Sequence, residues 1–433
     1  MFCDQCEQAR GGIGCSSMGM CGKDPDVHSL QETLLYGVKG LAAYAHHARR
    51  LGATDESVSA FIEDALFATL TNVNFDLQSH LELVLECGRK NLRVMQLLDE
   101  AHTRRFGAPS PAQVFEGMRP GPGILVTGHD LLDLSDLLAQ TAGQGVNVYT
   151  HGEMLPAHMY PELRRHAHLA GHYGGAWQRQ YEEFPRFPGA ILATTNCVLI
   201  PQNGYGSRLF STRVTAVPGG TRVQGNDFAP LIARARACPP LPAGPGKTTT
   251  IGFHHTVLLG LADKIVAAVQ SGKLRHFFLI GGCDGTEPGR NYYTELARLT
   301  PKDSLILTLG CGKYRIREED LGAFDLDGVG PIPRLLDMGQ CNDAYGAIQV
   351  AAGLAKAFGC GVNDLPLTIV LSWFEQKAVA VLLTLLALGV KGIRIGPQPP
   401  AFVSPNVMQV LQDQFDLRPI GDPEADLRAA LRR

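Results

Sequence analysis

From about residue 124 onward, short apolar segments alternate with loops and helical stretches. The segments are apolar along most of their length, which is typical of strands buried on both faces. Such strands, separated by helices, form parallel sheets with helices on both sides. The predicted strands are 124–127, 146–149, 190–193, 276–280, 304–308 and 367–371, and the predicted helices are 131–141, 255–270, 344–358 and 376–388.

The chain before these strands is helical instead. Residues 29–105 place apolar side chains at helical spacing, and Ser29 with Glu32 forms a capping-box pattern that predicts the start of the first helix. Two further helices are predicted at 54–70 and 75–105. Three antiparallel helices joined by short loops make a bundle.

Two stretches rich in Pro and Gly, 106–123 and 238–252, interrupt the pattern and are predicted to be linkers. A chain of 433 residues is also longer than one ordinary domain. We therefore predict a multidomain α and α/β fold. Its expected parts are an N-terminal loop with a three-helix bundle at 1–115, an α/β domain at 116–252 and a second α/β domain at 253–433.

Four cysteines near the N-terminus form the strongest local motif. Cys3, Cys6, Cys15 and Cys21 follow one another with two, eight and five residues between them, and several glycines lie among them. Four thiolates so close in sequence suit a [4Fe–4S] cluster or a tetrahedral zinc ion. Zinc sites usually pair two knuckles with two residues between the cysteines, and only one is present here. The spacing favours the cluster and leaves zinc as the alternative.

Composition and charge limit the location and the partners. No basic segment followed by an apolar one marks an export signal, so the protein is expected to be cytoplasmic, and its eleven cysteines are not read as disulfides. The longest apolar run, 378–390, is shorter than the span of about 20 residues that a membrane helix needs. The net charge of −3 argues against a nucleic-acid partner.

A potential metal ligand follows the end of seven predicted or possible strands, often beside a glycine. In open parallel sheets, ligands bind beyond the carboxyl ends of the strands. Any one of these residues alone is more simply explained by packing or by solvation. Together they describe a site with sulfur, nitrogen and oxygen donors, which suits a cluster with both sulfide and oxygen bridges. They are His129, Glu153, Cys197, Cys283, Cys311, Cys341 and Glu375.

Other candidates are set aside. Residues 244–248 look like a phosphate-binding loop, but the required first glycine is replaced by Leu241. His46 and His47 are neighbours on a helix, point to different faces and are predicted to be surface residues. The remaining cysteines, Cys87, Cys238 and Cys360, have no matching context and are predicted not to be ligands.

Seven motifs around these residues resemble the hybrid-cluster (prismane) protein family, also called the hydroxylamine reductase family. The motifs are VTGHD at 126–130, YTHGEMLP at 149–156, TNC at 195–197, GGCDG at 281–285, LGCGKYR at 309–315, MGQCND at 338–343 and SWFEQK at 372–377. The resemblance implies that the N-terminal quartet holds a [4Fe–4S] cluster. It also implies that the seven strand-end residues hold a hybrid [4Fe–2O–2S] cluster between the domains, and that Cys283 can carry an extra sulfur.

The resemblance also implies a fold and a size class. The family is related to the nickel carbon-monoxide dehydrogenases, with a helical domain and two Rossmann-like α/β domains. Longer members have two helical bundles in the first domain, whereas residues 29–105 have room for one. The chain therefore resembles the short class.

The function expected from this resemblance is the reduction of a small nitrogen oxide species, hydroxylamine or nitric oxide, with Cys283, Glu375 and Lys377 as catalytic residues. Lys377 is the candidate proton donor, and a structural pairing with a carboxylate is its alternative role. No nicotinamide or flavin motif is evident, so a separate reductase or a small iron–sulfur protein is expected to donate electrons. Two other possibilities are a nitric-oxide-responsive S-nitrosylase that uses the same cluster, and carbon-monoxide oxidation, which would need nickel.

Overall fold

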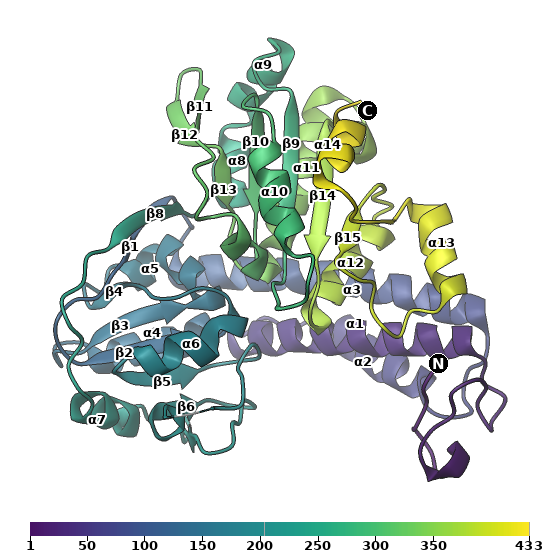
Figure 1. The fold of residues 1–433 in the computed structure, drawn as a ribbon, viewed down its shortest axis with the longest axis horizontal. Coiled ribbons are helices and arrows are strands. Elements are labelled where there is room, and N and C mark those ends of the chain that lie inside the picture. Colours follow the sequence, from purple (N-terminus) through teal and green to yellow (C-terminus); the bar gives the residue numbers. More distant parts are fainter. Residues whose placement is uncertain (203, 433) are drawn as a thin grey trace.

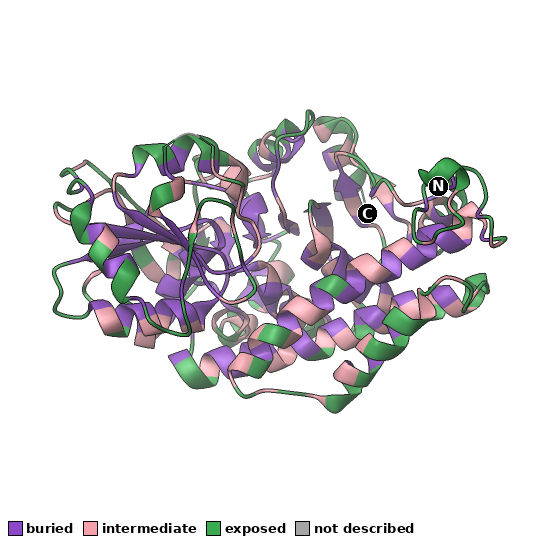
Figure 2. Cartoon of the chain, turned by 90° about the horizontal axis from the view of Figure 1, so that it is seen from below, coloured by how far each residue is buried: buried purple, intermediate pink, exposed green. Residues whose placement is uncertain are grey.

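The computed structural model describes residues 1–202 and 204–432. Two sheets lie beside a pair of long helices, and the N-terminal loop lies at the end of these helices that is remote from the first sheet (Figure 1). The strands are mostly buried, and the helices expose their outer faces (Figure 2). No helix in the described part of the chain is both long and apolar enough to cross a membrane.

The helical part contains α1 (Pro25–Arg50), α2 (Glu56–Ala68) and α3 (Leu77–Phe106), which confirms the predicted three helices. The predicted start of the first helix at Ser29 is wrong. Asp24 caps α1 through its side chain, which accepts the backbone N–H groups of Asp26 and Val27, and Pro25 occupies the first helical position. The Ser29 hydroxyl instead accepts the backbone N–H of Ser404 at 2.9 Å.

A fourth helix from the C-terminal half, α12 (Gln376–Ala387), packs against α1 and α3. The backbones approach closely at two glycines. A Cβ on Gly40 would lie 2.5 Å from the carbonyl oxygen of Gln376, and a Cβ on Gly88 would overlap the carbonyl oxygen of Leu383. These two contacts fix α12 against the bundle, one at its first residue and the other at Leu383 in its second half.

The first sheet has six parallel strands within the described residues, in the order β4-β3-β2-β5-β6-β7. Three of them, β4, β6 and β7, were not predicted, and they are two to four residues long. The strands are β2 (Gly123–Thr127), β3 (Asn147–His151), β4 (Leu169–His172), β5 (Ala190–Ala193), β6 (Leu209–Ser211) and β7 (Thr221–Arg222). The helices of this part are α4 (Leu131–Thr141), α5 (Pro161–Arg164), α6 (Gln180–Arg186) and α7 (Ala229–Ala237).

The second sheet also has six parallel strands within the described residues, in the order β13-β10-β9-β14-β15-β16. The strands are β9 (His276–Gly282), β10 (Ser304–Thr308), β13 (Leu335–Asp337), β14 (Leu367–Ser372), β15 (Arg394–Gly396) and β16 (Arg418–Pro419). Its helices are α8 (His255–Gly260), α9 (Ala262–Gln270), α10 (Asn291–Leu299), α11 (Ala344–Phe358), α13 (Pro405–Phe415) and α14 (Pro423–Leu431). The single helix predicted at 255–270 is wrong, because the backbone leaves helical geometry at Leu261, directly after Gly260.

The two predicted linkers contain strands that pair with each other. β1 (Ala112–Glu116) runs antiparallel to β8 (Lys247–Ile251). A short ribbon of β11 (Ala323–Leu326) and β12 (Gly330–Pro333) projects from the second sheet. The domain limits at 115 and 252 stay a prediction, and both fall at the ends of the β1–β8 pair.

Candidate metal centre

Both sheets change their direction of winding in the same way. In the first sheet the chain proceeds outward from β2 to β4 and then returns to place β5 beside β2, and in the second sheet β14 returns to lie beside β9. Ligands in such folds bind at the carboxyl ends of the strands that flank this switch point. His129 and Cys197 follow β2 and β5, whereas Cys283 and Glu375 follow β9 and β14.

The other three predicted ligands follow neighbouring strands at the same edges. Glu153 comes after β3, Cys311 after β10 and Cys341 after β13. The first sheet therefore contributes three candidate ligands and the second contributes four. The structure brings the candidates together from both sheets, as the strand-end placement predicted.

Sharp turns direct these side chains. Gly128 has φ +107° and Gly282 has φ +99°, and at both positions a Cβ would overlap a neighbouring strand or loop. Cys197 itself adopts φ 66°, a left-handed conformation that is costly for a residue other than glycine. The strained turn at Cys197 is typical of a functional position.

Direct hydrogen bonds join the two halves of the site. The side-chain N–H of Gln340 donates to the carbonyl oxygens of His129, at 3.1 Å, and of Glu153, at 2.7 Å. The backbone N–H of Cys341 donates to the Glu153 carboxylate at 2.9 Å. His129, Glu153 and Cys341 each offer a ligand atom within 4.8 Å of the others.

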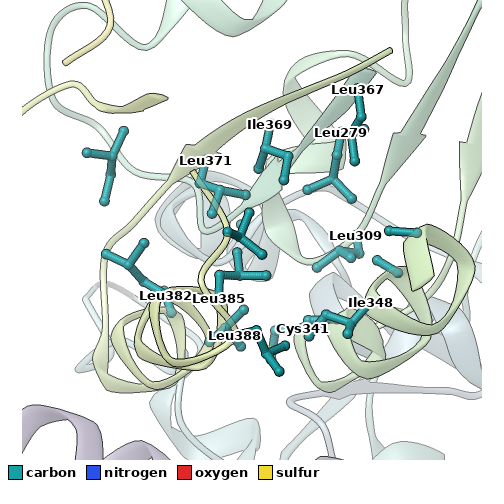
Figure 3. Close-up of a pocket in the computed structure, with 18 of the residues that line it drawn as sticks. Leu279, Leu309, Cys341, Ile348, Leu367, Ile369, Leu371, Leu382, Leu385 and Leu388 are labelled. Atoms are coloured by element: carbon teal, nitrogen blue, oxygen red, sulfur yellow. The ribbon is translucent and has the colours of Figure 1, made fainter. Parts of the chain in front are cut away.

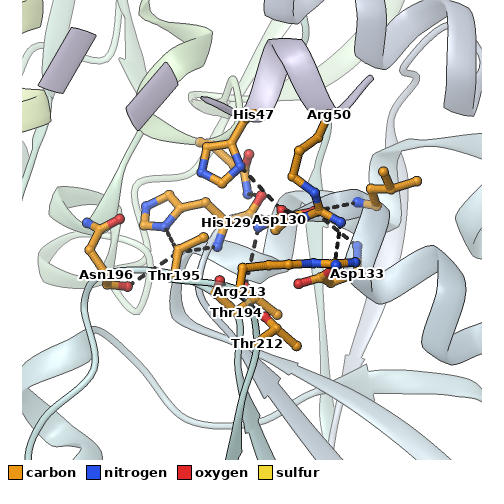
Figure 4. A network of polar contacts seen from close by, with 12 residues as sticks. His47, Arg50, His129, Asp130, Asp133, Thr194, Thr195, Asn196, Thr212 and Arg213 are labelled. Carbon is orange, nitrogen blue, oxygen red and sulfur yellow. Dashed lines mark hydrogen bonds and ion pairs between the residues drawn. The ribbon is translucent and has the colours of Figure 1, made fainter. Parts of the chain in front are cut away.

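The imidazole of His129 is oriented for one nitrogen to bind a metal. Its Nδ1 lies 2.8 Å from the hydroxyl of Thr195, which also accepts the His129 backbone N–H (Figure 4). Nε2 is the nitrogen left for a metal. Burial lowers the pKa of His129 well below its usual range, so the ring is neutral and its lone pair is available.

Asp130, the residue after His129, anchors this loop to the helical part. Its carboxylate pairs with Arg50 of α1 and lies 3.3 Å from Nδ1 of His47 (Figure 4). The prediction that His47 is a surface residue is therefore wrong: it is half-buried and contacts the residue next to a candidate ligand. His46 is exposed, as predicted.

A half-buried amide, that of Asn196, contacts two further candidates. The Asn196 side-chain N–H lies 3.2 Å from the Glu375 carboxylate and 3.3 Å from the Cys197 sulfur. Its carbonyl oxygen accepts the Lys377 ammonium at 2.7 Å. The ammonium also lies 5.6 Å from the ring centre of Tyr44 in α1. Among the described residues no ion pair within 4.0 Å joins Lys377 to a carboxylate, but its charge lowers the pKa of the nearby Glu375 carboxyl against the larger effect of burial. Both roles predicted for this lysine, proton donor and structural partner of a carboxylate, stay predictions.

The candidate ligands are acidic groups in a poorly solvated place. Burial raises the pKa of Cys341 to about 12 and that of Glu153 to about 7, and it raises the pKa of the Glu375 carboxyl. Burial also raises the pKa of the thiols of Cys197, Cys283 and Cys311. So many buried acids ionise together only beside cations.

One oxygen of Glu153 supports the same conclusion. Its Oε1 is buried and has no hydrogen-bond partner in residues 1–202 and 204–432. A buried carboxylate oxygen without a partner is costly, and a metal ion would satisfy it. The donor set therefore fits an iron cluster with sulfur, nitrogen and oxygen ligands.

The N-terminal quartet forms a separate site. Cys3 and Cys15 exchange backbone hydrogen bonds of 3.0 and 2.8 Å, which close the loop, and both are buried, while Cys6 and Cys21 are half-buried. Backbone N–H groups of Arg10 and Met20 lower the pKa of the Cys15 thiol. A thiol held this way is ready to bind a metal as the thiolate.

The three cysteines predicted not to be ligands lie elsewhere. Cys87 is buried within α3, Cys238 ends α7 and Cys360 follows α11. The false phosphate loop also has a plain explanation, because residues 247 and 248 belong to strand β8 rather than to a loop before a helix.

A second buried group, Asp99 with His254 and His255, has metal-ligand residue types. Its geometry is that of hydrogen bonding instead. The Thr256 backbone N–H donates to Nδ1 of His254, so Nε2 carries the proton and donates to Asp99 at 2.9 Å. This group joins α3 to α8.

An apolar cavity of about 310 Å³ adjoins the candidate centre (Figure 3). Cys283 and Cys341 contribute to its wall, and most of the rest is aliphatic, with Leu309, Ile348 and Leu371 among the lining residues. The cavity offers space for a small uncharged molecule next to two candidate ligands.

Comparison with known proteins identifies the family of the chain. The sequence pattern of the Prismane/CO dehydrogenase family matches residues 1–83 and 76–428. The chain belongs to this family. Hydroxylamine reductase from Moorella thermoacetica is 61% identical over 431 residues, and the match covers 100% of both chains.

Hydroxylamine reductase from Methanothermobacter thermautotrophicus is 50% identical, with 100% of both chains covered. In contrast, a match of 55% identity to hydroxylamine reductase from Syntrophobacter fumaroxidans covers 94% of this chain but 74% of that one. The chain thus matches some family members over their full length and is shorter than others, as expected for the short class.

Solved structures confirm the predicted relation to the carbon-monoxide dehydrogenase fold. Carbon monoxide dehydrogenase IV from Carboxydothermus hydrogenoformans superimposes with a TM-score of 0.77 at 15% identity, covering 100% of this chain and 92% of that one. The enzyme from Thermococcus sp. AM4 gives 0.76 at 17% identity, with 99% and 89% covered. At these identities the likeness shows the fold alone.

Family membership also identifies the cofactors. The chain is an iron–sulfur oxidoreductase that carries a [4Fe–4S] cluster and a hybrid cluster, which confirms iron–sulfur rather than zinc chemistry. The assignment of individual ligands stays a prediction that the geometry supports. Sequence reasoning missed Asn196, Gln340 and Tyr44. Asn196 and Gln340 each directly precede a predicted cysteine ligand in its motif, and this position in the sequence could have identified them. No sequence pattern indicates a role for Tyr44.

Proposed function

We propose that the chain reduces hydroxylamine to ammonia and water. The observation that carries this proposal is the identity of 61% and 50% to hydroxylamine reductases matched over their full length. The reaction takes two electrons and two protons: NH₂OH + 2e⁻ + 2H⁺ gives NH₃ + H₂O. When bound, the two clusters supply the electrons and an iron position at which the substrate binds.

The proposed ligands of the hybrid cluster are the seven strand-end residues, and those of the [4Fe–4S] cluster are Cys3, Cys6, Cys15 and Cys21. The burial of the seven, the orphaned oxygen of Glu153 and the neutral imidazole of His129 support the first assignment. The apolar cavity beside Cys283 and Cys341 supports entry of a small uncharged substrate at this end of the centre.

Lys377 is the proposed proton donor for N–O cleavage, beside Cys283 and Glu375 as the other proposed catalytic residues. Its ammonium carries three N–H donors, and one of them is directed to Asn196. The side chain is buried at the start of α12, close to Glu375, so bulk water does not compete for its protons. A Lys377→Gln variant with both clusters loaded is expected to lose most of its turnover, and unchanged turnover would exclude this role.

We propose that a separate protein donates the electrons through the N-terminal cluster. The side chains of Phe2, Ile13 and Met20 are exposed on this loop and offer an apolar contact surface. The loop contacts α1 at His28, and Tyr44 of the same helix lies beside Cys341. A Cys6→Ser variant whose hybrid cluster is reduced by the donor as fast as in the wild type would exclude this relay.

Nitric oxide is the second candidate substrate. The apolar lining of the cavity favours an uncharged diatomic molecule over a polar one. The balanced reaction, 2NO + 2e⁻ + 2H⁺ to N₂O + H₂O, takes the same number of electrons and protons. The same residues would serve both reactions.

One anaerobic experiment separates these possibilities. Loaded protein is given reduced methyl viologen as electron donor and either hydroxylamine or nitric oxide, and ammonia and nitrous oxide are measured. Formation of ammonia at a high multiple of the enzyme concentration supports the proposed function, and nitrous oxide supports the second candidate. Transfer of a nitrosyl group to protein thiols with neither product would indicate the regulatory role instead.

A further inference from the structure

Asn196 occupies a position where the two sheets meet. It follows β5 of the first sheet, while its amide contacts Glu375 and Lys377 at the start of α12 in the second half of the chain. Its side chain thus forms hydrogen bonds with Lys377 and with two proposed ligands, Cys197 and Glu375.

The contact with Lys377 decides which way the amide points. An ammonium group has donors only, so the atom 2.7 Å from its Nζ must be the Asn196 carbonyl oxygen. The NH₂ group then faces the Glu375 carboxylate and the Cys197 sulfur, both of which accept hydrogen bonds. An amide turned the other way would place its oxygen against two acidic groups.

Two consequences follow for a bound cluster. The N–H donated to Glu375 holds an oxygen ligand in place, as partners of metal ligands commonly do. The N–H donated to the Cys197 sulfur withdraws negative charge from that sulfur, and such hydrogen bonds raise the reduction potential of iron–sulfur clusters.

We infer that Asn196 is a positioning residue that, with its amide oriented by Lys377, holds Glu375 and sets the reduction potential of the hybrid cluster through Cys197. This inference rests on the proposed ligand set, but not on the identity of the substrate. Its measurement is a potential, so it can fail or succeed independently of hydroxylamine turnover.

The test uses full-length protein loaded anaerobically, with iron and sulfide analysis and a redox titration followed by electron paramagnetic resonance. In Asn196→Ala we expect the midpoint of the hybrid cluster to become more negative by about 59 mV, which is a tenfold change in the equilibrium constant of a one-electron couple. Asn196→Asp has the same shape but no N–H donor and added negative charge, so its midpoint is expected to be lower still. The midpoint of the N-terminal cluster should not move in either variant.

The matched control is Asn342→Ala. Asn342 is a buried amide one residue from Cys341, and its side chain donates to Asp343. Its midpoint is expected to equal that of the wild type. A loaded Asn196→Ala protein with an unchanged midpoint, or an equal shift in the Asn342 variant, would overturn the inference.

Loading itself is the second readout. If both Asn196 variants keep the N-terminal cluster and lose only the hybrid cluster, while their cluster-free forms unfold at the same urea concentration as the cluster-free wild type, the positioning role is supported. If the cluster-free variants unfold at a lower urea concentration, the role is structural and the inference fails. In a Lys377→Met background the effect of Asn196→Ala on the potential should shrink, because the amide is no longer held, and additive effects would overturn the orienting role of Lys377.

Discussion

The backbone N–H of Cys341 donates to the carboxylate of Glu153 at 2.9 Å, so a proposed ligand on the first sheet is held by the ligand loop of the second. Gln340, the residue before Cys341, strengthens this junction with its two hydrogen bonds to carbonyl oxygens of the first sheet. The geometry of the site therefore depends on how the two sheets meet as much as on either sheet.

Replacing Gln340 with Leu should weaken this junction. The side chain is buried, and its loss leaves the carbonyl oxygens of His129 and Glu153 unsatisfied, at a cost of about 2 kcal/mol or more in the free energy of unfolding. Urea unfolding of anaerobic protein, with iron analysis, measures both the stability and the loss of hybrid-cluster iron. In the control variant Gln78→Leu, at an exposed position, the change should stay below about 0.5 kcal/mol.

Adding one methyl group at Gly88 should disturb the packing of α12. A Cβ there would overlap the Leu383 carbonyl oxygen, and overpacking of this kind costs about 1–3 kcal/mol. The start of α12 would shift with it, so Glu375 and Lys377 would be displaced and hybrid-cluster iron should fall. Gly260→Ala is the matched control, since a Cβ at Gly260 meets nothing within 4 Å. Equal stability of the two variants would contradict the close contact between α3 and α12.

The stability of the chain should fall in mild acid partly because of His276. Burial lowers the pKa of this histidine to about 4, whereas the unfolded chain keeps a value near 6.5. As the pH falls below about 6.5, His276 binds a proton in the unfolded state but stays neutral in the folded state. The contribution of neutral His276 to the free energy of unfolding is therefore fully present above pH 6.5. It is lost progressively toward pH 4, by at most about 3 kcal/mol.

A His276→Gln variant should show a shallower loss of stability between pH 6.5 and pH 4 in urea unfolding. Thr368→Val is the control, because it removes the partner that lies 2.8 Å from the His276 ring and leaves the titrating group in place. If the wild type and His276→Gln lose stability in parallel, this histidine is not the cause.

Removing one thiol of the N-terminal quartet should remove one cluster and leave the other. In Cys6→Ser the iron content is expected to fall by about four atoms per chain, with the resonance signals of the hybrid cluster retained. Cys360→Ser, at a half-buried cysteine outside both sites, should keep all of its iron. Loss of both clusters in Cys6→Ser would show that the two sites depend on each other.

The sequence predicts this fold well where periodicity and strand ends carry the information. β5, β10, α4 and α11 match their predicted limits, and all seven strand-end residues lie at the carboxyl edges of the two sheets. These features are local, because strand and helix patterns extend over only a few residues.

What the sequence does not show depends on contacts between distant segments. Ser29 looks like a helix cap but bonds to Ser404, and the cap of α1 is Asp24. The packing of α12 into the bundle and the pairing of β1 with β8 join segments far apart in the chain. The roles of Asn196 and Gln340 likewise appear only when the two sheets are placed together.

The two sets of proposed ligands are spread very differently along the chain, and this affects when each can form during synthesis. The N-terminal set is complete once Cys21 has left the ribosome, whereas the other set requires Glu375 as well as the meeting of both sheets. The first cofactor can therefore be inserted into a nascent loop, while the second must await a nearly finished, folded polypeptide. The hybrid site is therefore expected to be the later of the two to become complete during maturation of the chain.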